Sequence, residues 1–167
     1  MDSMRSRRHS TSVGNTDAAR LLGVAVALVC SLSLSAAERD QHGKEHAWAG
    51  ATGSYVLIDF AASWCEPCWR SLPHLETLAK QYPKLRVLVV DVDETVAGRD
   101  RLVEKLRLTL PVVWDEKARI ATHYDPRGMP ATFVIDKSGK VIYSSIGFNK
   151  TTQKALEQFV SKLPLEQ

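Results

Sequence analysis

The sequence predicts one α/β domain in which a central mixed β-sheet carries helices on both faces. Two nearly continuous apolar runs, at residues 55–60 and 87–92, are typical of strands buried on both sides. Apolar residues at helical spacing follow each run, as expected of helices that pack on a sheet. Near the end of the chain, two apolar segments flank a turn sequence at residues 136–139, which indicates a hairpin. Alternating strands and helices that end in a hairpin imply both parallel and antiparallel pairing.

The elements can be assigned in order along the chain. Residues 66–82 form the first expected helix, and Pro67 suits its first turn because a proline there loses no helical hydrogen bond. After the second strand we expect a helix at 98–108, an extended segment at 111–114, a short helix at 116–124, hairpin strands at 131–135 and 141–144, and a last helix at 151–163.

The first 37 residues read as a targeting segment. Residues 1–20 are polar and contain four arginines, whereas no charged residue occurs from Leu21 to Ala37. Small residues at 35–37 complete the pattern of a secretory signal peptide cleaved after Ala37. The uncharged run of 17 residues is at the short limit for spanning a membrane, so an uncleaved anchor through residues 21–37 is the alternative. The predicted parts are a leader at 1–37, an N-terminal extension at 38–54 and a folded domain at 55–167.

Charge and composition exclude several classes of protein. The chain is 44% hydrophobic and 25% charged, which is typical of a globular domain. Its formal net charge is +3, but residues 38–167 hold 18 Lys and Arg against 17 Asp and Glu. This balance offers no basic surface for a nucleic acid, so we expect no nucleic-acid partner. Cys65 and Cys68 lie outside the leader, and export would place them in an oxidising compartment.

The chemistry is predicted at Trp64-Cys65-Glu66-Pro67-Cys68. A C-x-x-C sequence after a buried strand and at a helix start is a redox motif. The partial positive charge of a helix N-terminus favours a thiolate on Cys65, which would attack a substrate disulfide, and Cys68 would then resolve the mixed disulfide. We assign a tuning role to Glu66 and Pro67, since the charge of Glu66 opposes thiolate formation at Cys65.

Other uses of the two cysteines lack a required partner. A zinc site needs about four ligands, and haem attachment needs a histidine where Trp69 stands. A purely structural disulfide across so short a loop would add little stability. We therefore expect no metal and no cofactor beyond a redox-active disulfide.

A single acid interrupts the first buried strand. Asp59 has apolar or small neighbours on both sides, so burial should raise its pKa and suit it to proton transfer. The alternative is a carboxylate that reaches solvent at the end of the strand.

The motifs, taken together, resemble those of the TlpA/ResA-like exported thiol-disulfide oxidoreductases of the thioredoxin superfamily. The resemblance covers roughly residues 40–163 and rests on a series of segments in order. These are the strand at 56–60, residues 62–68 with the C-x-x-C motif, Pro73-x-Leu75-x-x-Leu78, Val90-Asp91-Val92-Asp93, Leu110-Pro111-Val112, and residues 128–136 followed by Gly139-Lys140. It implies a thioredoxin fold with a strand–helix insert at about 95–124, and a cis peptide bond before Pro130.

The resemblance also implies roles for individual residues. Pro130 would stand at the catalytic site with Cys65 and Cys68, and Asp59 matches the position of a proton-transferring aspartate in thioredoxins. Trp64, Gly128 and Met129 would contact the substrate. Cytochrome-maturation members carry a glutamate three residues after the second cysteine, and the chain departs from them there, because that position is Ser71.

The predicted function is reduction of disulfides in exported proteins by a monomeric enzyme that is periplasmic or otherwise exported. A membrane thiol reductase would supply the electrons, because an oxidising compartment holds no reducing pool. Two alternatives stay open: an oxidase that donates its disulfide, and a copper- or haem-delivery chaperone that uses the thiols as soft ligands. A peroxidase is disfavoured, because the segment before Cys65 lacks the threonine-bearing loop of such enzymes.

Overall fold

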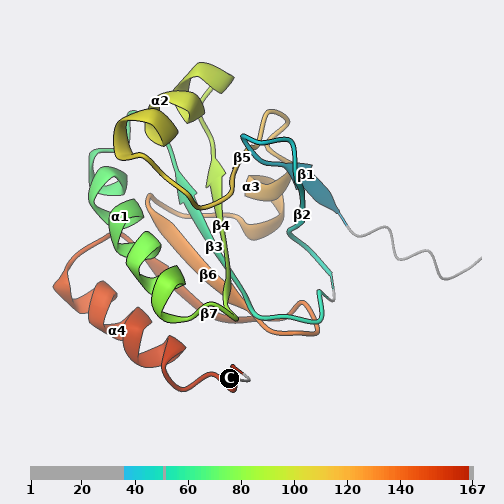
Figure 1. Cartoon of the computed structure of the whole chain (residues 1–167), viewed down its shortest axis with the longest axis vertical. Coiled ribbons are helices and arrows are strands. Elements are labelled where there is room, and N and C mark those ends of the chain that lie inside the picture. The colour runs from blue at the N-terminus through green and yellow to red at the C-terminus, as the bar shows by residue number, and fades with distance from the viewer. Residues whose placement is uncertain (1–35, 51, 166–167) are drawn as a thin grey trace, which may run out of the picture. The chain divides into compact units, whose positions relative to one another are not determined.

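The computed structural model describes residues 36–50 and 52–165, which form one α/β unit around a five-stranded sheet (Figure 1). The strands are β3 (Val56–Ala61), β4 (Arg86–Asp91), β5 (Val112–Trp114), β6 (Ala131–Ile135) and β7 (Val141–Ile146). Their order across the sheet is β5-β4-β3-β6-β7. The pairs β3–β4 and β4–β5 are parallel, while β6 and β7 run antiparallel, so the predicted mixed sheet is confirmed.

Helices cover both faces of this sheet, as predicted. Leu57 of β3 packs in one core cluster with buried residues of α1 (Glu66–Gln81), α2 (Val96–Leu106) and α4 (Lys150–Val160). Ile58 and Phe60 point to the other cluster, where α3 (Arg119–Tyr124) contributes Ile120 and Tyr124. Every residue of β3 is buried, because this central strand has helices above and below it. This burial on both sides explains why residues 55–60 form a nearly continuous apolar run.

The N-terminal extension adds a small hairpin at one sheet edge. Strands β1 (Ala37–Arg39) and β2 (Glu45–Ala47) pair antiparallel, and Gly43 in their turn has a φ of +78°, which glycine adopts without strain. The side chain of Gln41 donates to the carbonyl of Leu110 (2.9 Å) and accepts from the amide of Val112 (2.7 Å). The hairpin is thereby tied to β5, the edge strand. The predicted leader lies outside the described residues except for its last two, Ala36 and Ala37.

The resemblance implies an insert of one strand and one helix at 95–124, whereas the structure has the three elements that the residue patterns predict there, at 98–108, 111–114 and 116–124. They are α2, β5 and α3 in that order. The short segment 112–114 becomes a sheet strand because β4 offers it a parallel partner, with Val112 opposite Val89 and Trp114 opposite Asp91.

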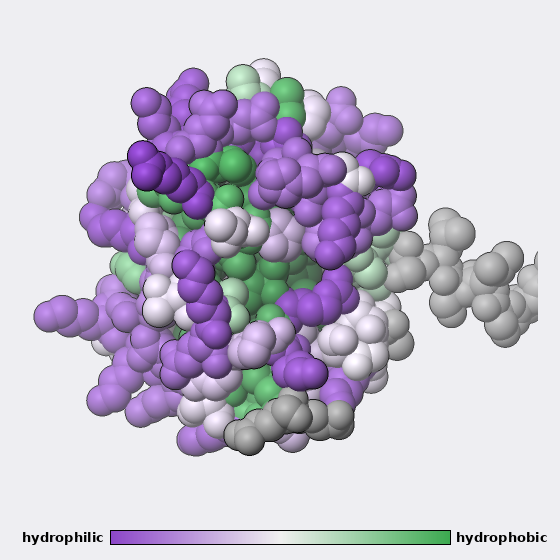
Figure 2. Space-filling model, viewed as in Figure 1, coloured by the Kyte–Doolittle hydropathy of each residue, from purple (hydrophilic) through white to green (hydrophobic). Residues whose placement is uncertain are grey.

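Hydrophilic residues cover most of the face seen in Figure 2, and hydrophobic residues show mainly in the middle of the view. Among residues 36–50 and 52–165, no helix is long and apolar enough to cross a bilayer.

Candidate active site

The two cysteines lie at the start of α1 and are joined by a disulfide with an S–S distance of 2.01 Å. Cys65 is the N-cap residue and its side chain leaves the cap unoccupied, while Pro67 stands in the first turn. Cys68 is fully buried, whereas Cys65 keeps 4% of its surface exposed. A sulfur at Cys65 therefore sits where free helix N–H groups and the helix dipole stabilise negative charge. This arrangement is the one predicted for the pair.

Asp59 is buried directly beneath this helix. Only 1% of its surface is exposed, and on β3 it faces the same side of the sheet as Leu57 and Ala61, which share a core cluster with both cysteines. The hydroxyl of Thr132 donates to Asp59 Oδ1 at 2.6 Å. Burial raises the pKa of Asp59 to about 7, and the hydrogen bond from Thr132 opposes that shift. The prediction that Asp59 is buried is confirmed, and the alternative of a carboxylate that reaches solvent is wrong.

The loop before β6 has the geometry that the resemblance implies. The Met129–Pro130 peptide bond is cis. Pro130 is buried and lines the same small cavity as Asp59, and its carbonyl accepts from the amide of Gly147 at 2.7 Å. Met129 is partly buried against both core clusters. A Cβ added at Gly128 would lie 2.9 Å from Ile146 Cγ2, so this loop lies close against β7.

Trp64 projects away from the protein beside the cysteines. Its exposed fraction is 66%, the largest among the hydrophobic side chains of the described residues. It borders a groove of about 430 Å³ that is otherwise lined by Ser63, Asp93, Glu94, Thr95, Gly98 and Arg101. An aromatic side chain this exposed has no packing role in the core, which favours the predicted contact with a substrate.

Glu66 is exposed, and its carboxylate lies 2.5 Å from Arg70 one helical turn later. The guanidinium offsets part of the negative charge that Glu66 places beside Cys65, an effect that was not anticipated from the motif alone.

The loop that carries Trp64 is held by residues to which the sequence assigned no role at the site. The Asp93 carboxylate accepts two hydrogen bonds from Ser63, one from its amide (2.6 Å) and one from its hydroxyl (2.9 Å). The indole of Trp69 donates to the Ser63 carbonyl at 3.0 Å, and the indole of Trp114 donates to the Asp93 carbonyl at 2.9 Å. The sequence does contain one signal for this contact, because Ser63 and Asp93 each follow a buried strand. Parallel strands that pair end at the same edge of a sheet, which brings the two residues together.

A second acid is buried at this edge. Asp91 is fully buried at the end of β4, and its Oδ1 accepts from the amide of Asp93 at 3.2 Å. Burial raises the pKa of Asp91 to about 8, and the neighbouring negative charge of Asp93 adds to the increase. Burial therefore disfavours the charged form of Asp91 near neutral pH, while Asp93 accepts the hydrogen bonds from Ser63.

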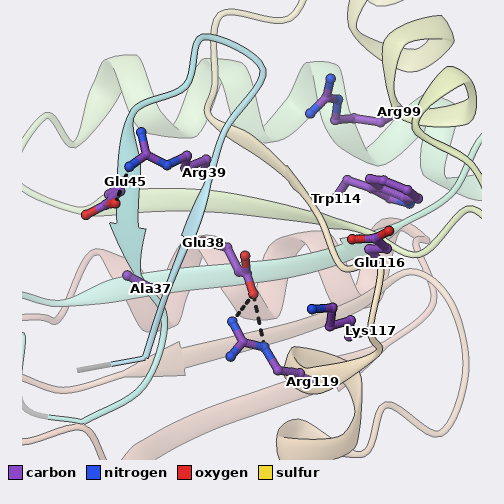
Figure 3. Close-up of a pocket in the computed structure, with 9 residues that line it drawn as sticks. All are labelled: Ala37, Glu38, Arg39, Glu45, Arg99, Trp114, Glu116, Lys117 and Arg119. Atoms are coloured by element: carbon purple, nitrogen blue, oxygen red, sulfur yellow. Dashed lines mark hydrogen bonds and ion pairs between the residues drawn. The ribbon is translucent and has the colours of Figure 1, made fainter. Parts of the chain in front are cut away.

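A separate hollow of about 380 Å³ lies beside β1 and β5 (Figure 3). Three of its basic residues are paired with acids: Arg119 bonds to Glu38, Arg39 to Glu45 at 2.6 Å, and Arg99 to Asp100 at 2.7 Å. None of the predicted site residues lines it. Within the part of the chain that the structure describes, no three His, Cys, Asp or Glu side chains gather as metal ligands would.

Comparison with known proteins adds a family and several relatives. The AhpC/TSA family matches residues 30–144, a range that includes both cysteines and Pro130. Thiol-disulfide oxidoreductase ResA of Geobacillus thermodenitrificans is 35% identical over 104 residues, 61% of this chain and 60% of the relative. ResA of Bacillus cereus is 30% identical over 126 residues, 74% of this chain and 72% of the relative. The chain thus spans about 60% of the length of the first of these relatives.

Solved structures agree with the fold. A Chlorobium tepidum protein that carries the provisional name thiol:disulfide interchange protein DsbE superposes with a TM-score of 0.69 at 30% identity, covering 75% of this chain and 90% of its own. StoA from Bacillus subtilis superposes with a TM-score of 0.64 at 19% identity, covering 75% of this chain and 95% of its own. These matches confirm the fold that the resemblance implies.

Proposed function

Because the chain belongs to the AhpC/TSA family, we propose that it is an exported thiol-disulfide oxidoreductase that reduces disulfides in other exported proteins. The observation that carries the proposal is the Cys65–Cys68 disulfide at the N-terminus of α1, above the buried carboxyl of Asp59. The names of the relatives ResA and DsbE agree with this chemistry.

The reaction begins with the pair reduced. The Cys65 thiolate, stabilised by the helix N-terminus, attacks one sulfur of the substrate disulfide and releases the other as a thiolate. The Cys68 thiol then gives its proton to the Asp59 carboxylate and attacks Cys65 Sγ. The mixed disulfide breaks, the second substrate sulfur leaves, and the Cys65–Cys68 disulfide forms. Two electrons have passed from the pair to the substrate.

Asp59 suits the role of base in the second step. A carboxyl with a pKa of about 7 exchanges protons readily near neutral pH, whereas a carboxyl in water is almost entirely ionised there. Thr132 holds one oxygen of this carboxyl, so that the other is available to receive a proton.

The substrate surface is proposed to consist of Trp64 together with Gly128 and Met129. Pro130 has no N–H, so it cannot continue a strand ladder, but Met129 keeps an amide and a carbonyl that could pair with an extended substrate strand. A membrane thiol reductase would return the pair to the dithiol state, and the balanced charge of residues 38–167 gives no support for a nucleic-acid partner.

The test separates the two cysteines. Cys65→Ser should abolish insulin reduction, whereas Cys68→Ser should accumulate mixed disulfides with substrates, because the resolving thiol is missing. Cys30→Ser is the matched control, since it removes the third cysteine and should leave reduction unchanged. A Cys68→Ser variant that traps no partner and reduces insulin normally contradicts the mechanism.

Two further measurements address direction and location. A reduction potential near about −270 mV supports a reductant, and one near about −120 mV supports the oxidase alternative. Cell fractionation with N-terminal sequencing should find an exported chain that begins at Glu38. A full-length chain in the membrane fraction would instead indicate an anchor.

A further inference from the structure

A small cavity with a mixed polar and apolar lining lies between β3, α1, α4 and the β6–β7 hairpin. Its volume of about 10 Å³ is roughly what one water molecule requires. Its polar lining comprises Asp59, Ser71, His74, Thr132, Ser145, Thr152 and Gln153. Cavities in proteins that have several polar groups in their lining hold ordered water. Ser71 also bonds to the carbonyl of Cys68 at 3.2 Å, so the cavity adjoins the turn that carries the resolving cysteine.

Two titratable side chains on this cavity each have a buried atom without a hydrogen bond. Among the described residues, no group forms a hydrogen bond with Asp59 Oδ2 or with His74 Nε2, although Nε2 lies within ion-pair distance of Glu157. Asp59 is 99% buried as a consequence of its place in the central strand, so its free oxygen has no access to bulk water. Buried polar atoms are nearly always satisfied by protein or by ordered water, and a water in the cavity would satisfy Asp59 Oδ2.

His74 connects the cavity with the surface. Its side chain is 15% exposed, and its Nε2 lies 3.5 Å from Oε1 of Glu157, whose side chain is 45% exposed. Gln153 supports the histidine from α4, because its amide nitrogen lies 3.3 Å from His74 Nδ1 and donates to Glu157 Oε1 at 3.2 Å. Asp59 and His74 thus line one cavity, and His74 in turn contacts the exposed carboxylate of Glu157.

We infer that one water in this cavity and the imidazole of His74 carry protons between Asp59 and solvent, with Glu157 as the outer group. The inference rests on the proposed disulfide exchange. When Cys68 resolves a mixed disulfide, its proton passes to Asp59, then to the water, then to His74, and leaves to solvent. When a dithiol donor reduces the pair again, one proton returns along the same route to Cys68. His74 is neither oxidised nor reduced and touches no substrate, so it is a positioning and relay residue.

The groups around the route have a simple charge pattern. The titratable groups that face it are Asp59 on β3, His74 on α1 and Glu157 on α4. The polar residues that β6 and β7 contribute to the lining, Thr132 and Ser145, are neutral. An imidazole is suited to the middle position, because it can accept a proton at one nitrogen while it releases one from the other.

The kinetic test compares His74→Gln with His42→Gln, an exposed histidine in the β1–β2 turn, as the matched control. Glutamine keeps a polar partner for Gln153 but cannot carry a proton at neutral pH. His74→Gln should slow the resolving step about tenfold, less than the 10²- to 10⁴-fold typical of losing a general base itself. The decrease in the rate of the resolving step should be larger in heavy water, and imidazole buffer should restore the rate. The reduction potential of the Cys65–Cys68 pair should stay unchanged.

A second readout does not depend on activity. In the oxidised chain, NMR signals of the His74 ring should show a transition that coincides with titration of the Asp59 carboxyl, and Asp59→Asn should abolish it. Wild-type rates in His74→Gln, or a His74 ring that does not sense Asp59, would overturn the relay. If the wild-type chain itself reduces no disulfides, the proposed function is refuted. The NMR experiment would still decide whether His74 and Asp59 are linked.

Discussion

Replacing Asp59 with asparagine should make the protein more stable at alkaline pH. In the folded chain the pKa of Asp59 is about 7, because burial disfavours the charged form, whereas the ordinary value for aspartate is 3.8. Between these values the unfolded chain releases its proton and the folded chain retains it. Wild-type stability therefore falls as pH rises from about 4 to about 7, and it stays lowered above that range. Asparagine has no such transition, and its carbonyl oxygen can still accept from Thr132.

The size of this effect follows from the same values. A difference of about 3 pH units, at about 1.4 kcal/mol for each unit, corresponds to about 4 kcal/mol. The free energy of unfolding of Asp59→Asn, relative to wild type, should therefore rise by up to about 4 kcal/mol between pH 4 and pH 8. Asp91 contributes a slope of the same sign, but it is present in both chains and cancels from the comparison.

Urea unfolding of the two oxidised chains across this pH range is the appropriate assay. Asp125→Asn serves as the control, because it makes the same chemical change at an exposed position that pairs with Arg127 on the surface. A difference for Asp59→Asn that does not change with pH, or that shrinks as pH rises, would show that Asp59 is not desolvated in the folded chain and would refute the reasoning.

Three other predictions concern the site and its supports. Gly98→Ala should cost about 1–3 kcal/mol in urea unfolding, because its Cβ would lie 2.2 Å from Asp93 Cγ, and an unchanged midpoint would contradict this packing. Trp64→Ala should change stability by less than about 0.5 kcal/mol, as expected of an exposed side chain. It should nevertheless raise KM for protein substrates while leaving reduction of a small disulfide unchanged, and equal effects on both would argue against a docking role. Asp59→Asn should slow resolution by Cys68 about 10²-fold in stopped-flow measurements, with the pH dependence near 7 removed. A rate profile identical to that of wild type would return Asp59 to a structural role.

Much of the fold follows from local patterns. The apolar runs at 55–60 and 87–92 identify β3 and β4 because a strand covered on both faces excludes polar side chains. For the same reason the single acid in β3 could be recognised as buried, whichever strands flank it. The start of α1 could also be predicted from the C-x-x-C motif, because Cys65, Pro67 and Cys68 lie at the N-cap and within the first turn of the helix.

The extended segment of the insert could be predicted, but its partners in the sheet could not. Residues 112–114 are too few to fold by themselves, and they form β5 because β4 provides a parallel partner and Gln41 of the N-terminal extension satisfies the backbone beside it. No local pattern specifies a partner that lies 71 residues away.

The sequence by itself determined the buried strands β3 and β4, the redox motif and the burial of Asp59, because each depends on residues close together in the chain. Only the tertiary structure decided which side chains support that chemistry. Asp93 meets Ser63 because β4 pairs with β3 in the register that places Asp91 opposite Ala61. His74 meets Gln153 because α4 packs beside α1 on the same face of the sheet. Such contacts are fixed by strand register and helix packing, which depend on the whole core and cannot be read from any one segment.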